Sequence, residues 1–151
     1  MLPTEYRPCV VAVFTNSAGQ VLVGERSDCP GAWQFPQGGI DPGESALNAL
    51  YREMREEIGC DSFRIKREAA GLIKYRFPSE MTSKIAKKWL GQSQIWFLVE
   101  FDQGAVPNLS IAEGEFANLA WRSVSDVIDG IILWKKETYI EGLTKLGVYC
   151  V

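Results

Sequence analysis

Residues Gly38–Cys60 read GGIDPGESALNALYREMREEIGC, and this stretch predicts the dominant helix of the protein. A Gly/Pro turn opens it, and after Glu44-Ser45 apolar residues recur at steps of three and four. That spacing is typical of the buried face of an amphipathic helix. Gly59 stands where a glycine commonly ends a helix. The stripe expected to be buried consists of Leu47, Leu50, Tyr51, Met54 and Ile58.

Three glutamates, Glu53, Glu56 and Glu57, share a neighbouring face of this helix. Like charges three and four residues apart weaken a helix by a few tenths of a kcal/mol per pair. One interpretation is a solvated acidic face that Arg52 and Arg55 offset. The other is that the carboxylates share a hard divalent cation, because all-oxygen ligands suit Mg²⁺ or Mn²⁺. The sequence contains no histidine, which excludes a His-ligated metal.

The spacing of the fixed residues favours the metal interpretation. The stretch follows G-x5-E-x7-R-E-U-x-E-E-x-G-U, where U is a bulky apolar residue, and it resembles the Nudix box of the Nudix pyrophosphohydrolases. Seven fixed residue types coincide by chance on the order of once in 10⁸ positions. The last U is Cys60, a departure from the usual aliphatic residue, but cysteine packs as a small hydrophobe. The matching residues are Gly38, Glu44, Arg52, Glu53, Met54, Glu56, Glu57 and Gly59.

The composition is that of an ordinary globular protein. With 151 residues, 46% of them hydrophobic and 23% charged, the chain is expected to form a single domain over residues 1–151. Its net charge of −3 gives no general attraction to polyanions, so we expect no DNA partner and no membrane partner. The four cysteines form no C-x-x-C pair, and no secretory leader is evident, which predicts reduced thiols and a cytoplasmic location. A monomer is expected.

Strands are expected on both sides of the box helix, with a further helix near the end. Gln20–Glu25 is expected to form a hairpin with the first strand, and the polar segment Pro78–Gly91 predicts a loop or a short helix. This order predicts a mixed sheet covered on both faces, in agreement with the α/β/α sandwich that the Nudix resemblance implies. The predicted strands are Cys9–Phe14, Gln20–Glu25, Trp33–Phe35, one strand within Phe63–Arg76, Gln94–Phe101 and Leu119–Arg122. The later helices are Ser123–Asp129 and Lys135–Leu146.

Fragments outside the box are similar to one branch of the family. That branch contains the bacterial RNA pyrophosphohydrolases and the plant-type asymmetric diadenosine tetraphosphate hydrolases, and the resemblance runs from about residue 6 to residue 146. The fragments that carry it are Tyr6-Arg7-Pro8, Trp33–Ile40, Gly91–Gln94 with Trp96-Phe97, Glu115-Phe116, Ala120-Trp121 and Trp134–Lys136.

The resemblance implies two or three Mg²⁺ ions, with Mn²⁺ as a substitute. The implied ligands are Glu53, Glu56, Glu57, Glu115 and the carbonyl near Gly38. Arg52 resembles the arginine that orients the box glutamates, and Glu44 resembles the carboxylate that ties the loop to the helix. Gly38 and Gly59 match structural positions of the box.

Hydrolysis of a P–O–P bond suits these groups, because the charge of a polyphosphate repels a nucleophile. Metal ions neutralise that charge, lower the pKa of a bound water and hold the attacking and leaving oxygens. Glu56 is the first candidate for the general base, with Glu57 and Glu115 as rivals. The alternative role for Glu56 is metal ligation alone, since the same carboxylate can do either.

The resemblance also implies a substrate-binding set. The three cationic residues of this set, Arg7, Arg26 and Lys135, match positions that contact phosphates in the family, although each alone could equally be plain surface charge. Trp134 matches an aromatic that stacks on a base, an interaction worth about 1–3 kcal/mol; the alternative is a core residue. Ile95 departs from a branch position that is often basic, which predicts fewer phosphate contacts from that strand. The implied substrate-binding residues are Arg7, Arg26, Tyr75, Gln92, Trp134 and Lys135.

Three functions compete on this sequence. The first is asymmetric hydrolysis of diadenosine tetraphosphate to ATP and AMP. The loop Arg26–Trp33 resembles the dinucleotide hydrolases more closely than the RNA pyrophosphohydrolases. The second is conversion of a 5′-triphosphate RNA end to a 5′-monophosphate end. The third is a Nudix module that binds nucleotide or RNA without hydrolysis. Loss of a box glutamate or of the arginine would favour this last function, but all are present. The expected partner is therefore a nucleotide polyphosphate or an RNA 5′ end.

Overall fold

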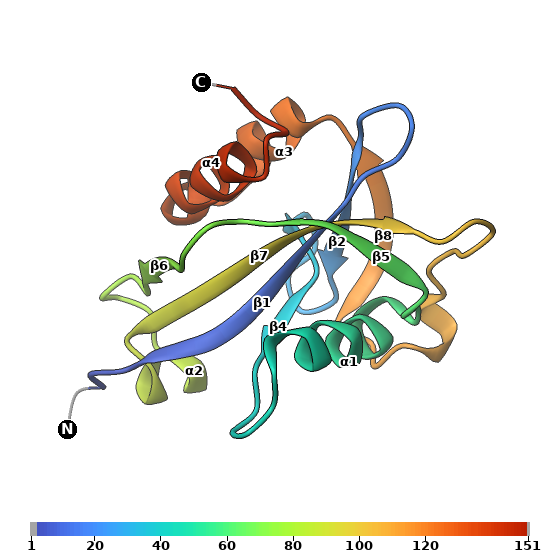
Figure 1. The fold of residues 1–151 in the computed structure, drawn as a ribbon. Helices are drawn as coiled ribbons and strands as arrows, with labels where there is room; N and C mark the ends of the chain where they lie inside the picture. The colour runs from blue at the N-terminus through green and yellow to red at the C-terminus, as the bar shows by residue number, and fades with distance from the viewer. Residues whose placement is uncertain (1–2, 151) are drawn as a thin grey trace.

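The computed structural model describes residues 3–150, and its centre is a mixed five-stranded sheet with helices on both faces (Figure 1). Two long strands run parallel through the middle of this sheet, while their other neighbours pair antiparallel. The first of them contains the run CVVAVF, which is buried on both faces as its unbroken apolar pattern predicts. Across the sheet the strands are β4 (Gln37–Gly39), β1 (Tyr6–Phe14), β7 (Gly91–Phe101), and then β5 (Phe63–Glu68) and β6 (Ile73–Arg76), which both pair with β7.

A second, antiparallel sheet contains β3 (Trp33–Gln34), β2 (Val21–Arg26) and β8 (Phe116–Arg122). The predicted hairpin between the first two strands is therefore wrong, and among the described residues a single bridge pairs Val21 of β2 with Thr15, the residue after β1. The turn after β1 directs the chain away, and β2 pairs with β8 instead. Gly24 permits this pairing, because a Cβ there would lie 2.5 Å from the ring of Phe116.

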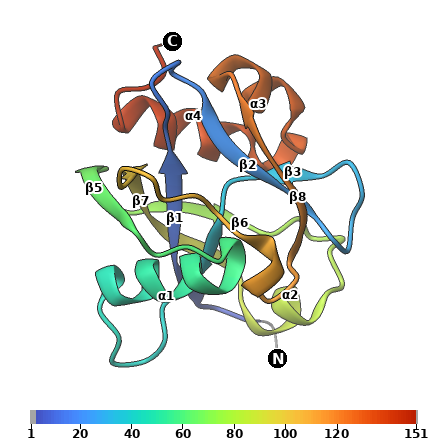
Figure 2. The same cartoon turned by 90° about the vertical axis from the view of Figure 1, so that its right-hand side faces the viewer.

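Helices cover the two faces of the five-stranded sheet, and Figure 2 shows the sheet between them. Helix α1 packs on one face, and α3 and α4 pack on the other, so that two separate apolar clusters form. The polar segment before β7 contains one short helix, α2, with no buried residue. The helices are α1 (Ala46–Ile58), α2 (Lys84–Lys88), α3 (Val124–Gly130) and α4 (Lys136–Lys145), with short 3₁₀ turns at Leu109–Ile111 and Leu133–Lys135.

Helix α1 begins and ends as its sequence predicts. The Ser45 hydroxyl accepts a hydrogen bond from the Asn48 amide at 3.1 Å, and Gly59 ends the helix with φ of 67°. The buried stripe differs in one position, because Leu47 is 47% exposed while Ala49 is fully buried. Alanine is small enough to let the helix lie close to β1. The helix is therefore rotated about its axis so that Ala49 faces the sheet and Leu47 faces solvent.

The segment expected to hold one strand between Phe63 and Arg76 holds two, β5 and β6. They are separated near Gly71, whose φ of 74° suits a glycine and breaks the extended backbone. The remaining predicted elements are present, and the Ser123 hydroxyl caps α3 by accepting a hydrogen bond from the backbone N–H of Asp126 at 3.1 Å.

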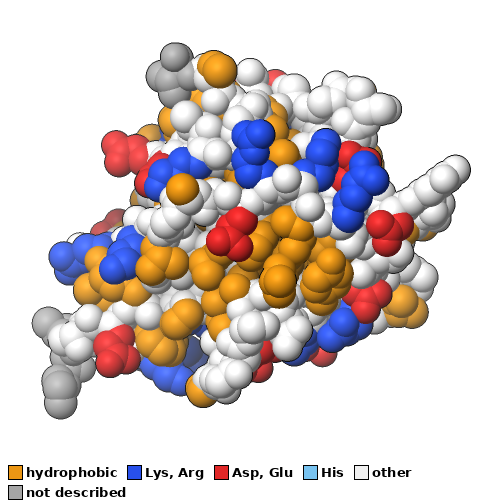
Figure 3. Space-filling view, in the orientation of Figure 1, with side chains coloured by type: hydrophobic (Ala, Val, Ile, Leu, Met, Phe, Trp, Pro, Cys, Tyr) orange, Lys and Arg blue, Asp and Glu red, His pale blue; other side chains and the backbone are white. Residues whose placement is uncertain are grey.

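On the side turned to the viewer in Figure 1, hydrophobic side chains gather above α1 (Figure 3). No helix in the described part of the chain is long and apolar enough to cross a membrane. All four cysteines carry free thiols, and Cys9 is buried in the sheet.

Candidate active site

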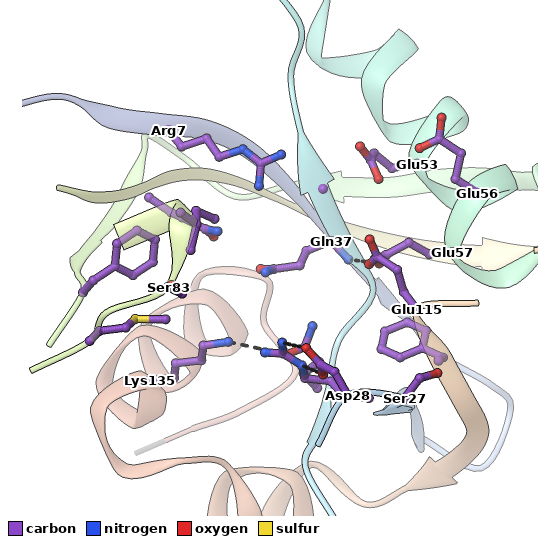
Figure 4. Close-up of a pocket in the computed structure, with 18 of the residues that line it drawn as sticks. Arg7, Ser27, Asp28, Gln37, Glu53, Glu56, Glu57, Ser83, Glu115 and Lys135 are labelled. Carbon is purple, nitrogen blue, oxygen red and sulfur yellow. Dashed lines mark hydrogen bonds and ion pairs between the residues drawn. The ribbon is translucent and has the colours of Figure 1, made fainter. Parts of the chain in front are cut away.

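A cavity of about 500 Å³ opens at one end of the sheet, between α1 and the 3₁₀ turn before α4 (Figure 4). Carboxylates line one side, which we call the acidic wall: Glu53, Glu56, Glu57 and Glu115. Cations line the other side, which we call the cationic wall: Arg7, Arg26 and Lys135. Residues predicted as metal ligands and residues predicted to bind substrate therefore meet around one space.

Strand β4 brings the acidic wall into the cavity. Gly38 lies against the side chain of Glu53, and a Cβ at this glycine would stand 1.8 Å from the Glu53 Cδ. One residue earlier, the backbone N–H of Gln37 donates to Glu57 Oε1 at 2.8 Å. The Gly38 position is thus fixed by close approach between strand and helix, and the backbone of β4 forms the floor below the glutamates.

Arg52 stands behind the acidic wall and does not line the cavity. Its guanidinium donates twice to the carboxylate of Glu44, at 2.8 Å each, and once to the Gly39 carbonyl at 2.8 Å. It also reaches Glu53 at 2.9 Å and Glu56 at 3.2 Å. The hydrogen bonds from Arg52 and from the Asp41 backbone N–H lower the pKa of Glu44 to about 2. Arg52 and Glu44 thus anchor the turn and two glutamates in one network.

The negative charges of the acidic wall are not fully balanced by neighbouring cations, and the pKa values of two of its glutamates are raised. Burial raises the pKa of Glu53 to about 7, against the opposing effect of Arg52. Burial and the neighbouring carboxyl of Glu115 raise the pKa of Glu57 well above its ordinary value. An all-oxygen donor set with this charge deficit fits a hard divalent cation. Within residues 3–150, however, no three carboxylate, cysteine or histidine side chains are already gathered around a single point.

The cationic wall comes from three separate elements. A Cβ at Gly39 would lie 2.6 Å from Arg7 Nη2, so the absence of a side chain at this second glycine of β4 leaves the space that the Arg7 guanidinium occupies. Arg26, at the end of β2, is held by the Asp28 carboxylate at 2.8 and 2.6 Å. Lys135 is only 8% exposed, and burial together with the charge of Arg26 lowers its pKa to about 8.

An aromatic cluster closes the cationic end of the cavity. The rings of Tyr75 and Trp134 have centroids 5.4 Å apart, and Phe77 lies 5.8 and 6.3 Å from them. Trp134 is half-buried and lines the cavity, so its ring is not enclosed in a core as the alternative interpretation required. Burial raises the pKa of Tyr75 above its ordinary value, and its hydroxyl therefore stays protonated at neutral pH.

The prediction for Ile95 is corrected by the alternation of β7. Gln92, Gln94 and Trp96 share the face that meets the cavity, whereas Ile95 points to the other face. There it lines a separate hollow beside Tyr6 and Ile40. An apolar residue at this position therefore removes no cation from the cavity.

The sequence analysis did not assign several residues at or near the cavity to the site, and Asp28, Gln37 and the buried Gln94 are the ones that hold other site residues. The period-two pattern of Gln92, Gln94 and Trp96 was the available signal for Gln94. Gln37 carried no signal, because its partners Glu57 and Gln94 lie 20 and 57 residues away in the sequence. Asp28 lies only two residues from its partner Arg26, but an acidic residue in a loop is ordinarily surface charge. Lys84, Lys87 and Lys88 are exposed and do not line the cavity, although Ser83 and Ile85 beside them do.

Comparison with known proteins gives consistent results. The family model described as NUDIX domain matches residues 5–141. An RNA pyrophosphohydrolase of Campylobacter jejuni (strain 81-176) is 39% identical over 140 residues, which are 90% of this chain and 89% of that protein. Nudix hydrolase 25 of Arabidopsis thaliana is 36% identical, covering 98% of this chain and 90% of its own length. A solved Ap4A hydrolase of C. elegans shares the fold with a TM-score of 0.64 at 17% identity, over 93% of this chain and 99% of that one.

Proposed function

Because the chain belongs to the Nudix family and is a pyrophosphohydrolase, we propose that it converts the 5′-triphosphate end of RNA to a 5′-monophosphate end. One water is consumed, one phosphoanhydride bond is broken, and pyrophosphate leaves. The names of relatives about 39% identical to this chain favour RNA over the dinucleotide that the sequence analysis put first. Diadenosine tetraphosphate is the second candidate.

The observation that carries this proposal is that the acidic and cationic walls face each other across one cavity (Figure 4). A triphosphate is long and highly charged, so it needs cations along part of its length and metal-binding oxygens at the scissile bond. Arg7, Arg26 and Lys135 would bind the phosphates on one side, and Trp134 would stack on the adjoining base.

The acidic wall would hold the metal ions, through Glu53, Glu56, Glu57 and Glu115 with the carbonyl near Gly38. Members of this family use divalent metal ions; we propose two or three Mg²⁺ ions, replaceable by Mn²⁺. When bound, such ions supply Lewis acidity and lower the pKa of a water. The chain's own residues orient the reaction: Arg52 braces two of the glutamates from behind, and the Gln37 backbone N–H fixes Glu57.

Glu56 is our candidate for the general base. Its side chain is 33% exposed, against 12% for Glu53, and only its Oε2 is taken up by Arg52, at 3.2 Å. The other oxygen is free among the described residues to accept a proton from a water in the cavity. Glu57 is more deeply buried and Glu115 is exposed, so each is a weaker candidate.

One observation favours the dinucleotide. Apolar side chains of Met81 and Ile85 line the cavity near the aromatic cluster of Tyr75, Phe77 and Trp134. This surface gives a nucleoside an apolar area to pack against, and a dinucleotide carries two nucleosides.

A cytoplasmic location and a monomeric state are part of the same proposal, and both rest on the sequence.

The deciding experiment compares two substrates in parallel. The purified protein is incubated with Mg²⁺ and either 5′-triphosphorylated RNA or diadenosine tetraphosphate, and kcat/KM is measured for each. We expect the RNA end to be preferred, and Glu56→Gln to lower the turnover of both substrates by roughly 10³-fold, while Glu68→Gln on the exposed side of β5 leaves turnover unchanged. A preference for the dinucleotide would overturn the proposed substrate, and full turnover by Glu56→Gln would overturn the proposed base.

A further inference from the structure

A chain of amide hydrogen bonds lies beneath the floor of the cavity. The Trp96 indole N–H donates to Gln94 Oε1 at 2.8 Å. The Gln94 amide nitrogen then donates twice, to Gln92 Oε1 at 2.9 Å and to Gln37 Oε1 at 3.1 Å. Trp96, Gln94 and Gln92 are 0%, 2% and 3% exposed, so these bonds form away from water.

The direction of this chain is fixed at Trp96. An indole N–H is a donor only, so the Gln94 oxygen must face it. Both hydrogens of the Gln94 amide are then available for two other acceptors, and each of them finds a carbonyl oxygen. Gln92 and Gln37 must therefore turn their oxygens toward Gln94, which leaves their NH₂ groups at the opposite side of each amide.

Those two NH₂ groups face the cavity. Gln92 and Gln37 both line it, and within residues 3–150 neither amide nitrogen donates to another protein group. No buried side-chain nitrogen or oxygen in this part of the chain lacks a hydrogen-bond partner, so these nitrogens are accessible from the cavity. The Gln37 backbone at the same time holds Glu57, which ties the amide chain to the acidic wall.

The indole itself is locked in place. Its ring meets Phe35 and Tyr139 edge-on, at centroid distances of 5.7 and 5.5 Å. Gly142 of α4 permits this packing, because a Cβ there would lie 2.4 Å from the indole ring. The donor that sets the direction of the chain is therefore held by the apolar core between the sheet and α4.

We propose that Trp96 and Gln94 are positioning residues that make the side chains of Gln92 and Gln37 present N–H donors, and not their carbonyl oxygens, to the substrate's phosphate oxygens. The inference rests on the proposed function, because it assigns these donors to a polyphosphate. A glutamine amide fits its space almost equally well when its oxygen and nitrogen exchange places. Without the indole donor the chain reverses, and carbonyl oxygens instead of N–H groups face the phosphates.

The first test uses ¹⁵N-labelled protein with the Glu56→Gln substitution, in which hydrolysis of the added ligand is expected to be roughly 10³-fold slower. Inorganic triphosphate is added, and the side-chain amide signals of Gln92 and Gln37 are followed by NMR. We expect both signals to shift on binding, and the Trp96 indole proton to show only weak contacts with the Gln94 amide protons. Unmoved amide signals, or a strong contact between the indole and those amide protons, would overturn the proposal.

The second test reverses the chain. Gln94→Glu places a carboxylate that accepts from Trp96 and also attracts the NH₂ groups of Gln92 and Gln37. Trp96→Phe removes the donor and keeps most of the ring. Loss of two hydrogen bonds to a charged group predicts a rise in KM of about 100-fold for either variant, with a smaller change in kcat. Trp121→Phe, in β8 of the other sheet, is the matched control and should leave KM unchanged.

The measurements separate the two proposals from each other. Triphosphate binding and the amide signals report on the positioning role even if the favoured substrate is wrong, while turnover of RNA reports on the function. Melting curves for Gln94→Glu and Trp96→Phe show whether they are folded. A folded variant of either kind that keeps the wild-type KM and amide shifts would overturn the positioning role.

Discussion

The two walls of the cavity are built in different ways. Three glutamates of the acidic wall come from one helix, and Arg52, itself held by Glu44 from the same stretch of chain, contacts two of them, Glu53 and Glu56. The cationic wall takes Arg7, Arg26 and Lys135 from three elements far apart in the sequence. A network within one stretch of chain holds two glutamates of the acidic wall, while the fold as a whole brings the residues of the cationic wall together. We therefore expect damage to the acidic wall to reduce catalysis, and damage to the cationic wall to weaken binding.

The largest effect is expected for Glu56→Gln. The amide keeps the size of the side chain but neither takes a proton nor ligates a metal well, so kcat should fall by roughly 10³-fold. KM should change little, since the cationic wall is intact. Single-turnover kinetics at saturating substrate measure this, with Glu68→Gln as the control. If Glu56→Gln raised KM and left kcat unchanged, the acidic wall would act in binding, and the proposed difference between the two walls would be wrong.

Gly38→Ala should come next. The added Cβ would stand 1.8 Å from the Glu53 Cδ, so the side chain must move away from its place at the cavity. A displacement of about 1 Å at a catalytic group costs on the order of 100-fold in rate. Gly130→Ala is the matched control, because a Cβ there meets no heavy atom within 4 Å. Equal kcat values for the two variants would contradict the tight packing between β4 and α1.

Trp134→Ala tests the aromatic edge of the cationic wall. Loss of one base stack costs about 1–3 kcal/mol, so KM should rise by roughly 10-fold or more, with kcat almost unchanged. Trp134→Phe keeps a stacking ring and should lose much less. The comparison is made by measuring KM for 5′-triphosphorylated RNA and for inorganic triphosphate, which carries no base. An equal loss for both ligands would assign Trp134 to packing rather than to base recognition.

The smallest effect concerns the pH dependence of binding. Burial lowers the pKa of Lys135 from 10.5 to about 8, so the folded protein loses this charge as the pH rises through 8. KM should therefore increase several-fold between pH 7 and pH 9, measured from initial rates. Lys135→Arg keeps its charge over this range and should flatten the profile. A rise of the same size in that variant would assign the pH dependence to another group.

The same shift has a consequence for stability, with the opposite sign. Between pH 8 and 10.5 the unfolded chain holds a proton on Lys135 that the folded chain has released. The cost of burying the charge is fully present below pH 8 and is relieved as the pH rises. Thermal unfolding of the wild type and of Lys135→Met should therefore differ most below pH 8 and converge at higher pH.

Three of the four glutamates of the acidic wall could be predicted from the sequence because their spacing is local, whereas Glu115 followed only from the family resemblance. Glu53, Glu56 and Glu57 lie on one helix face by periodicity alone, and Gly59 marks the end of that helix. Leu47 was misplaced because periodicity gives the stripe but not the rotation of the helix, which the small side chain of Ala49 decides.

The cationic wall could be predicted only through resemblance to a family. Nothing local in the sequence brings Arg7, Arg26 and Lys135 together, and the Asp28 that holds Arg26 gave no signal. The hairpin error has the same origin, because the pairing of β2 with β8 joins residues almost 100 positions apart. Periodicity describes single elements, whereas these features depend on which elements become neighbours.

Gly38 and Gly39 bear on how such a site could be moved to another protein. Successive residues of a strand point to opposite faces, and here one glycine admits Glu53 while the next admits Arg7. The two missing side chains therefore act as a notch through which groups of opposite charge approach the same strand. An engineer who transplants the box helix as a cassette would have to carry this notch with it, and supply a strand neighbour bearing an arginine. A helix grafted without the two glycines would keep its glutamates, but the side chain of Glu53 would have no room beside the strand.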